Sequence, residues 1–204
     1  MRVVNAGIAR TGCAAALAML LSVPSPQAAR PDAITPPPVP PGIPAPAGTE
    51  AFLAGHAIGT QNYICLPSAV GFAWTLFGPQ ATLFGEGGRQ IITHFLSPNP
   101  DESGLARATW QHSRDTSAVW AFATASSSDP NFVAPGAIPW LILDVVGDED
   151  EPTGSDTLSE ATAIHRVNTT GGVAPPTGCT QAADVGSRTF VPYTADYFFY
   201  RDED

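Results

Sequence analysis

The chain has 204 residues, of which 44% are hydrophobic and only 14% charged, and its formal net charge is −10. This length and apolar content are sufficient for one folded domain and argue against a disordered chain. Binding to phosphate backbones or to anionic membrane surfaces needs clustered cations, so we expect no nucleic-acid partner.

The first segment, residues 1–28, is predicted to be a secretory signal peptide. Arg2 and Arg10 precede a short apolar run over residues 13–23, and small residues follow it. The run is too short to span a bilayer, and no other stretch is long enough, so we expect no stable membrane insertion. We therefore predict that the acidic mature protein is secreted or periplasmic.

A proline-rich segment follows at residues 29–49 and holds eight prolines. Proline fixes φ and has no N–H to donate, so this segment cannot form a helix or a central strand. We expect an extended lead-in that lies partly on the domain. The remainder, residues 50–204, is predicted to form a single β domain.

The domain consists of short apolar or alternating segments separated by Gly, Pro, Asn and Ser. The alternation is clear where Ile92, His94 and Leu96 share one face of a strand. Such a pattern predicts an all-β fold, either an antiparallel β-sandwich or a jelly-roll-like barrel. The candidate strands are 50–57, 59–66, 70–77, 90–96, 105–112, 117–125, 138–146, 160–168 and 190–200.

Two segments have alternative interpretations. Residues 157–160 match a helix capping box, so 158–166 could be a helix, although its β-branched residues favour a strand. The acidic run 148–151 is predicted to be a solvated turn. Its clustered carboxylates could instead hold Ca²⁺, but they lack the regular spacing of a calcium loop.

Export determines how the cysteines are interpreted. Cys13 leaves with the signal peptide, which leaves Cys65 and Cys179. A single pair in an oxidising compartment is expected to form a disulfide, with two buried free thiols as the alternative. Closing a loop of this length would stabilise the fold by about 4–5 kcal/mol.

From about Val39 onward the sequence resembles the domain of unknown function 3455 family, whose fungal members are often labelled malate dehydrogenase. The resemblance implies an exported fold with the same disulfide and brings no established activity. It rests on four motifs in order: GTQNYIC at 59–65, AIPWLIL at 137–143, RVNTTGGVAP at 166–175 and VPYTADYFFY at 191–200.

The chain departs from the family between His94 and Trp110, where an altered or inserted loop is expected at 96–108. The dehydrogenase label is rejected on physical grounds. A dinucleotide fold needs a strand, a Gly-x-Gly-x-x-Gly turn and a helix, and no such sequence is present.

Two sets of residues are candidates for a functional site. His94 and His112 lie on neighbouring predicted strands and could form a metal site with Asp115 or His165, although no pair of them shows a short ligand spacing. Trp110, beside the altered loop, is the best candidate for an exposed ligand-binding ring, whereas Trp140 is expected in the core.

One acidic residue, Asp196, stands within an aromatic strand, and a structural ion pair with Arg166 is expected. Our leading hypothesis is a binding or structural module at the cell exterior, with its best surface at 94–115. Its ligand would be a carbohydrate or another cell-surface component. The alternative is a small, metal-assisted extracellular enzyme. No cofactor is expected.

Overall fold

The computed structural model describes Met1, residues 34–150 and residues 155–203. Apart from Met1, the predicted signal peptide, 1–28, lies outside the described residues, as do the start of the lead-in and the end of the acidic turn. The account that follows concerns the unit that begins at Ala33.

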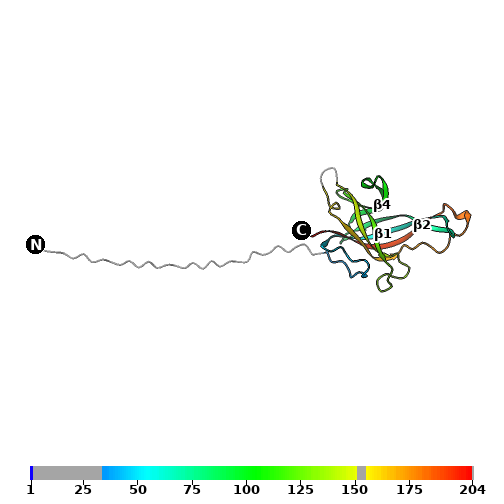
Figure 1. Ribbon diagram of the computed structural model, residues 1–204, viewed down its shortest axis with the longest axis horizontal. Coiled ribbons are helices and arrows are strands. Elements are labelled where there is room, and N and C mark those ends of the chain that lie inside the picture. The colour runs from blue at the N-terminus through cyan, green and yellow to red at the C-terminus, as the bar shows by residue number, and fades with distance from the viewer. Residues whose placement is uncertain (2–33, 151–154, 204) are drawn as a thin grey trace. The chain divides into compact units, whose positions relative to one another are not determined.

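Eight antiparallel strands form one closed barrel in which each strand pairs with the next and the last pairs with the first (Figure 1). Two single 3₁₀ turns, η1 (Pro100–Glu102) and η2 (Ala182–Asp184), interrupt the connections. The strands are β1 (Thr49–Ser68), β2 (Gly71–Phe84), β3 (Gln90–Asn99), β4 (Leu105–His112), β5 (Ala118–Ser127), β6 (Trp140–Glu149), β7 (Ala163–Gly171) and β8 (Arg188–Asp202).

The all-β, antiparallel prediction is confirmed, but the barrel is neither a sandwich nor a jelly roll. Both predicted architectures connect strands that are not neighbours in the chain, whereas here every connection joins adjacent strands. Alternation in a sequence reveals which face of a strand is buried but not which strand it pairs with. The closure of β1 onto β8 could therefore not be predicted from the sequence.

Local boundaries also differ from the prediction. The expected strands 50–57 and 59–66 are one 20-residue strand, β1. Of the two interpretations of 158–166, the strand is correct for its second half, because β7 begins at Ala163 and residues 157–160 form turns. The predicted loop at 96–108 is an extension of β3 to Asn99, followed by η1 and the start of β4.

Two hydrophobic cores lie on the two faces of the sheet. The inner core fills the barrel and includes Leu83, Ile92 and Phe199, each fully buried. The outer core covers β6 to β8, where Ile43 of the lead-in packs near Trp140. The Ile43 carbonyl accepts a hydrogen bond from the ring of His165 at 2.8 Å. The lead-in therefore lies against the barrel, and β7 and β8 are buried on both faces where it does so.

The far halves of β1 and β2 extend beyond the barrel as an arm, defined here as residues 62–78 (Figure 1). The pairing of β2 with β3 is confined to Ala81–Phe84, and Pro79 has no N–H for further pairing in this direction. The disulfide Cys65–Cys179, confirmed here, fastens the arm to the segment before β8.

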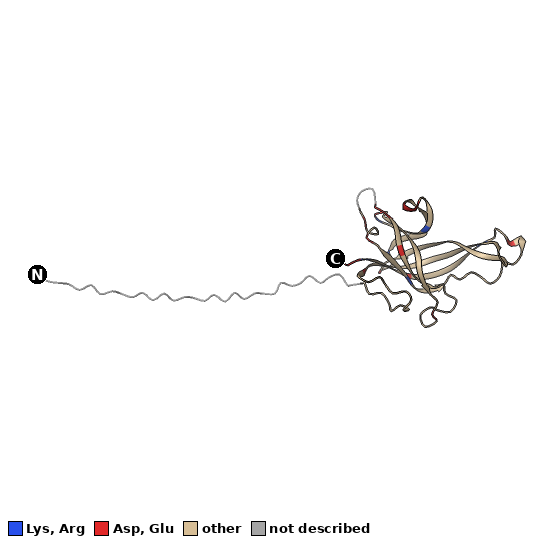
Figure 2. Cartoon of the chain, viewed as in Figure 1, with Lys and Arg blue, Asp and Glu red and all other residues tan. Residues whose placement is uncertain are grey.

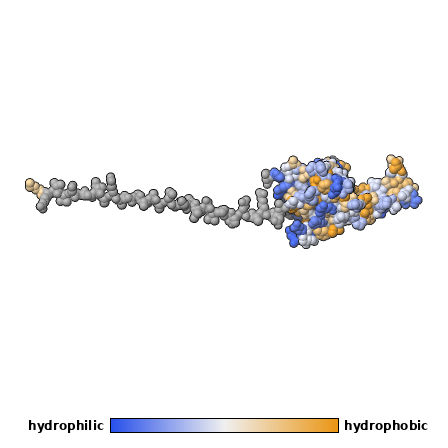
Figure 3. All heavy atoms as spheres, turned by 90° about the horizontal axis from the view of Figure 1, so that it is seen from below, coloured by the Kyte–Doolittle hydropathy of each residue, from blue (hydrophilic) through white to orange (hydrophobic). Residues whose placement is uncertain are grey.

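Charged side chains are absent from the arm and from the whole of β2. No Lys, Arg, Asp or Glu occurs between Glu50 and Glu86 (Figure 2). Apolar side chains are exposed at the arm's end, where Val70 is 97% exposed (Figure 3). No helix among the described residues has the length and hydrophobicity needed to cross a membrane.

Candidate functional site

A cavity of about 250 Å³ opens into the barrel where the arm leaves it. It forms because β2 turns away from β3 above Ala81, while β3 continues alongside β4. Exposed apolar side chains line its rim and buried aromatic rings line its floor. The lining residues are Gln61, Leu76, Phe77, Gly78, Pro79, His94, Leu96, Ala108, Trp110, Leu141, Leu143, Arg166 and Tyr197.

The floor of the cavity is a stack of aromatic rings. His94 and Trp110 lie parallel, with ring centroids 4.2 Å apart, and Tyr197 meets the Trp110 ring edge-on at 5.6 Å. Their strands place them there because His94 and Trp110 are directly opposite in the β3–β4 pairing. Both are almost fully buried. The floor is thus a closely packed aromatic cluster.

His94 is neutral in this environment. Its Nδ1 lies 2.8 Å from the carbonyl oxygen of Thr109, which can only accept, so Nδ1 carries the proton and Nε2 is left as an acceptor. Burial lowers the pKa of His94 to about 3, and the positive charge of Arg166 acts in the same direction. The ring therefore contributes stacking surface and one acceptor atom but no charge.

Arg166 brings the only formal charge into the wall of the cavity. It lies on β7, between Leu141 of β6 and Tyr197 of β8, and its Nη2 donates to the Pro139 carbonyl at 2.9 Å. The predicted ion pair with Asp196 is wrong. The Asp196 side chain lies on the outer face, where it bonds instead to His56 and Asn168.

Three buried N–H donors in the cavity wall have no acceptor among the described residues. They are Nε2 of Gln61, Nε1 of Trp110 and Nε of Arg166. Only two other buried side-chain polar atoms in the described chain lack a partner, on Trp140 and Ser159, and neither residue lines the cavity. A buried donor without an acceptor destabilises the fold by about 1–3 kcal/mol. Most of the buried side-chain atoms without a partner in the described chain are on residues that line this cavity.

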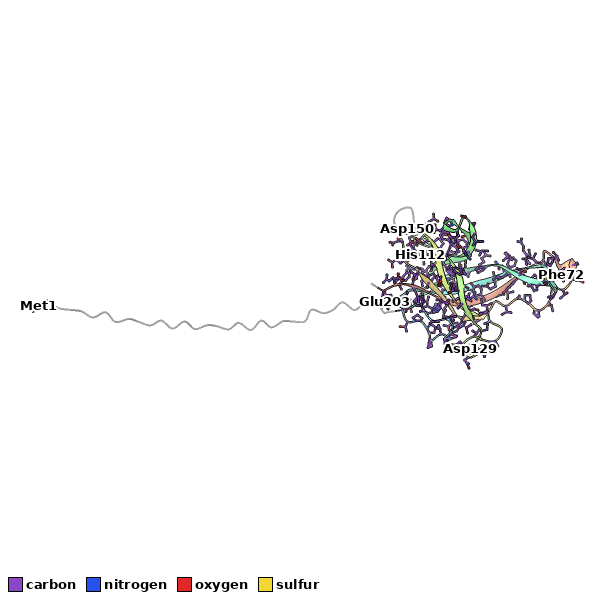
Figure 4. All side chains as sticks on the ribbon, in the orientation of Figure 1. Met1, Phe72, His112, Asp129, Asp150 and Glu203 are labelled. Atoms are coloured by element: carbon purple, nitrogen blue, oxygen red, sulfur yellow. A yellow bond between two sulfur atoms is a disulfide. The ribbon has the colours of Figure 1, made fainter. Side chains whose placement is uncertain are left out.

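The residues predicted to form a metal site are not brought together. His94 lies in the aromatic floor. His112 ends β4 (Figure 4) and pairs instead with Asp115, in the following turn, at 2.8 Å. No group of three or more His, Cys, Asp or Glu side chains in the described part of the chain is arranged to hold a metal ion.

Asp115 is instead the centre of a dense hydrogen-bond cluster. One carboxylate oxygen accepts from His112 and from the hydroxyl and amide of Ser117, and the other from Ser155 and from the hydroxyl and amide of Thr157. Burial opposes its ionisation, but the bonds from Thr157, Ser117 and His112 hold the pKa of Asp115 below its ordinary value. The carboxylate joins the turn after β4 to the segment before β7.

The two predictions about tryptophan have different outcomes. Trp140 is buried, as expected. The expectation that Trp110 is exposed is wrong, because the ring is only 1% exposed and faces the barrel interior. It nevertheless lines the cavity, so its proposed role in binding moves from the surface to the interior.

Sequence reasoning missed Gln61 and Tyr197 as site residues and assigned Arg166 to the wrong partner. One signal was present for Arg166. It stands two residues after Ile164 in a strand whose alternate positions face the same side. An arginine at an inward position of an apolar strand is a candidate binding residue.

Comparison with known proteins gives one result. A family model described as a protein of unknown function, DUF3455, matches residues 46–201. Neither the curated proteins nor the solved structures contain a match.

Proposed function

Because the chain belongs to the DUF3455 family, whose description assigns no function, we propose from the barrel's geometry that the protein binds a small, largely apolar molecule in the cavity at the base of the arm. The observation that carries the proposal is the coincidence, in one cavity, of a stacked aromatic floor and three buried donors without acceptors. Apolar walls with a few convergent polar groups are typical of ligand sites.

The composition of the wall favours an apolar ligand over the carbohydrate expected from the sequence. A sugar presents a hydroxyl on nearly every carbon, and each needs a partner when buried. Most of the lining side chains here are aliphatic or aromatic. The volume, about 250 Å³, lies just below the usual range for drug-sized ligands and indicates a small molecule.

Binding outside the cytoplasm is part of the same proposal. The disulfide between Cys65 and Cys179 supports an oxidising compartment, and the predicted signal peptide points the same way. Catalysis through His112 and Asp115 has less support, because the Asp115 oxygens are already occupied by structural donors.

The test is to fill the cavity. Ala108 lines it, whereas Ala106 lies two positions away on the same strand and is exposed. Ala108→Leu should abolish the chemical-shift changes that toluene, benzyl alcohol or hexanol cause at the indole N–H of Trp110. Ala106→Leu should leave them intact. Binding that survives Ala108→Leu, or no binding of any uncharged or charged probe by the wild type, would refute the proposal.

A further inference from the structure

We infer that the cavity selects a small carboxylate, such as an aromatic or short aliphatic acid in its ionised form. The carboxylate would lie on Arg166 and the apolar body against Trp110 and His94. This inference rests on the proposed function and adds the charge and chemical class of the ligand.

The first step is the missing countercharge. The chain has 19 acidic residues, yet no Asp or Glu lines the cavity. No ion pair in the described part of the chain includes Arg166, although five others involve arginine or histidine on the outside of the barrel or in its turns. A half-buried guanidinium is costly to keep without an anion, which indicates that an anion belongs there.

The second step is the reach of that charge. Arg166 acts electrostatically on His94, Tyr63, Tyr193 and Tyr197, all of them interior groups. None of the four experiences a compensating negative charge from an Asp or Glu. These interior groups therefore lie within reach of one positive charge. An anionic ligand would be attracted and an amine repelled.

The third step is the set of donors around the charge. Nη2 of Arg166 is held by the Pro139 carbonyl, which fixes the plane of the guanidinium and leaves Nε–H without an acceptor. Trp110 adds a second N–H. Nε2 of the Gln61 amide adds a third. A planar carboxylate offers several lone pairs and suits a guanidinium with such neighbours.

The fourth step is size. The nitrogen atoms that lack acceptors are enclosed by the wall, so the acceptor must be small enough to enter and the side chains must turn slightly to meet it. A single carboxylate on a ring or a short chain meets that condition within about 250 Å³, whereas a long-chain lipid does not.

The experiment compares benzoate, benzamide and benzylamine, which share one apolar body and differ in charge, by calorimetric titration of the full chain. We expect benzoate to bind at least tenfold more tightly than benzamide, and benzylamine not to bind. Arg166→Met should abolish the preference for benzoate, so that benzoate and benzamide bind this variant with equal affinity. Arg114→Met, which removes the same charge from an exposed turn, should change nothing.

The outcomes separate the two proposals. Equal affinity for benzoate and benzamide in the wild type overturns the carboxylate inference but leaves a ligand-binding cavity in place. Failure of all three compounds and of the uncharged probes above overturns the proposed function itself. If Arg166→Met does not fold, Arg166→Gln replaces it, and the wild-type comparison of the three compounds is decisive without any variant.

Discussion

Two clusters of buried polar groups in this barrel have opposite characters. Around Asp115, six hydrogen bonds converge on one carboxylate. Around Arg166, donors outnumber acceptors and three N–H groups have none. Buried polar groups stabilise a fold when they are paired and destabilise it when they are not. The first cluster therefore supports the structure, and the second is the place where we propose that a ligand binds.

The largest effect on stability is expected from removing the disulfide. This bridge holds the arm, which contributes residues to the rim of the cavity. Replacing Cys65 and Cys179 together with serine should lower the free energy of unfolding by about 4–5 kcal/mol, since the bridge closes a loop of 114 residues. Urea denaturation of the two proteins measures this. The Asp115 cluster should remain intact in the variant, so unchanged NMR signals for His112 and Ser117 are the control.

The next largest effect is expected at the satisfied cluster. Asp115→Ala removes the shared acceptor and leaves the buried donors of His112, Ser117 and Thr157 unpaired. We expect a loss of about 3–5 kcal/mol. Asp144→Ala, at an exposed position of β6, is the matched control and should change stability by less than about 0.5 kcal/mol. Similar losses in both variants would show that Asp115 has no special structural role.

The pH dependence of stability tests the protonation state of His94, in the floor of the cavity that holds the unsatisfied cluster. His94 stays neutral in the fold down to a pKa of about 3, whereas in the unfolded chain it takes up a proton near pH 6.5. The unfolded state binds more protons in this window, so stability should fall as pH is lowered from 6.5, by about 1 kcal/mol per unit.

The control for this pH dependence is His94→Gln, which keeps a polar side chain but cannot titrate. Its stability should change less between pH 6.5 and 4 than that of the wild type, as measured by urea midpoints at each pH. An unchanged slope in the variant would mean that His94 is protonated in the folded state.

The smallest effect on stability is expected at the unsatisfied cluster. Arg166→Met exchanges an uncompensated charge for an apolar side chain of similar length, so the free energy of unfolding should change by less than about 1 kcal/mol or rise. Thermal unfolding without ligand measures this. A loss comparable to that of Asp115→Ala would mean that Arg166 is a structural residue, and the contrast between the clusters would disappear.

The sequence by itself determined the local features of this protein. Alternation and turn residues predicted an all-β chain with most strands near their observed positions. The count of cysteines after the predicted signal peptide predicted the Cys65–Cys179 bridge, and four motifs indicated the family. Each of these depends on neighbouring residues or on composition, which a single sequence displays directly.

Only the tertiary structure decided which residues meet. The closure of β1 onto β8, the burial of Trp110 under His94, and the placement of Arg166 in a cavity depend on pairing between strands far apart in the chain. Alternation fixes the face of a side chain but carries no information about its cross-strand neighbour. The candidate site is built from seven different strands, so its composition became visible only when the barrel closed.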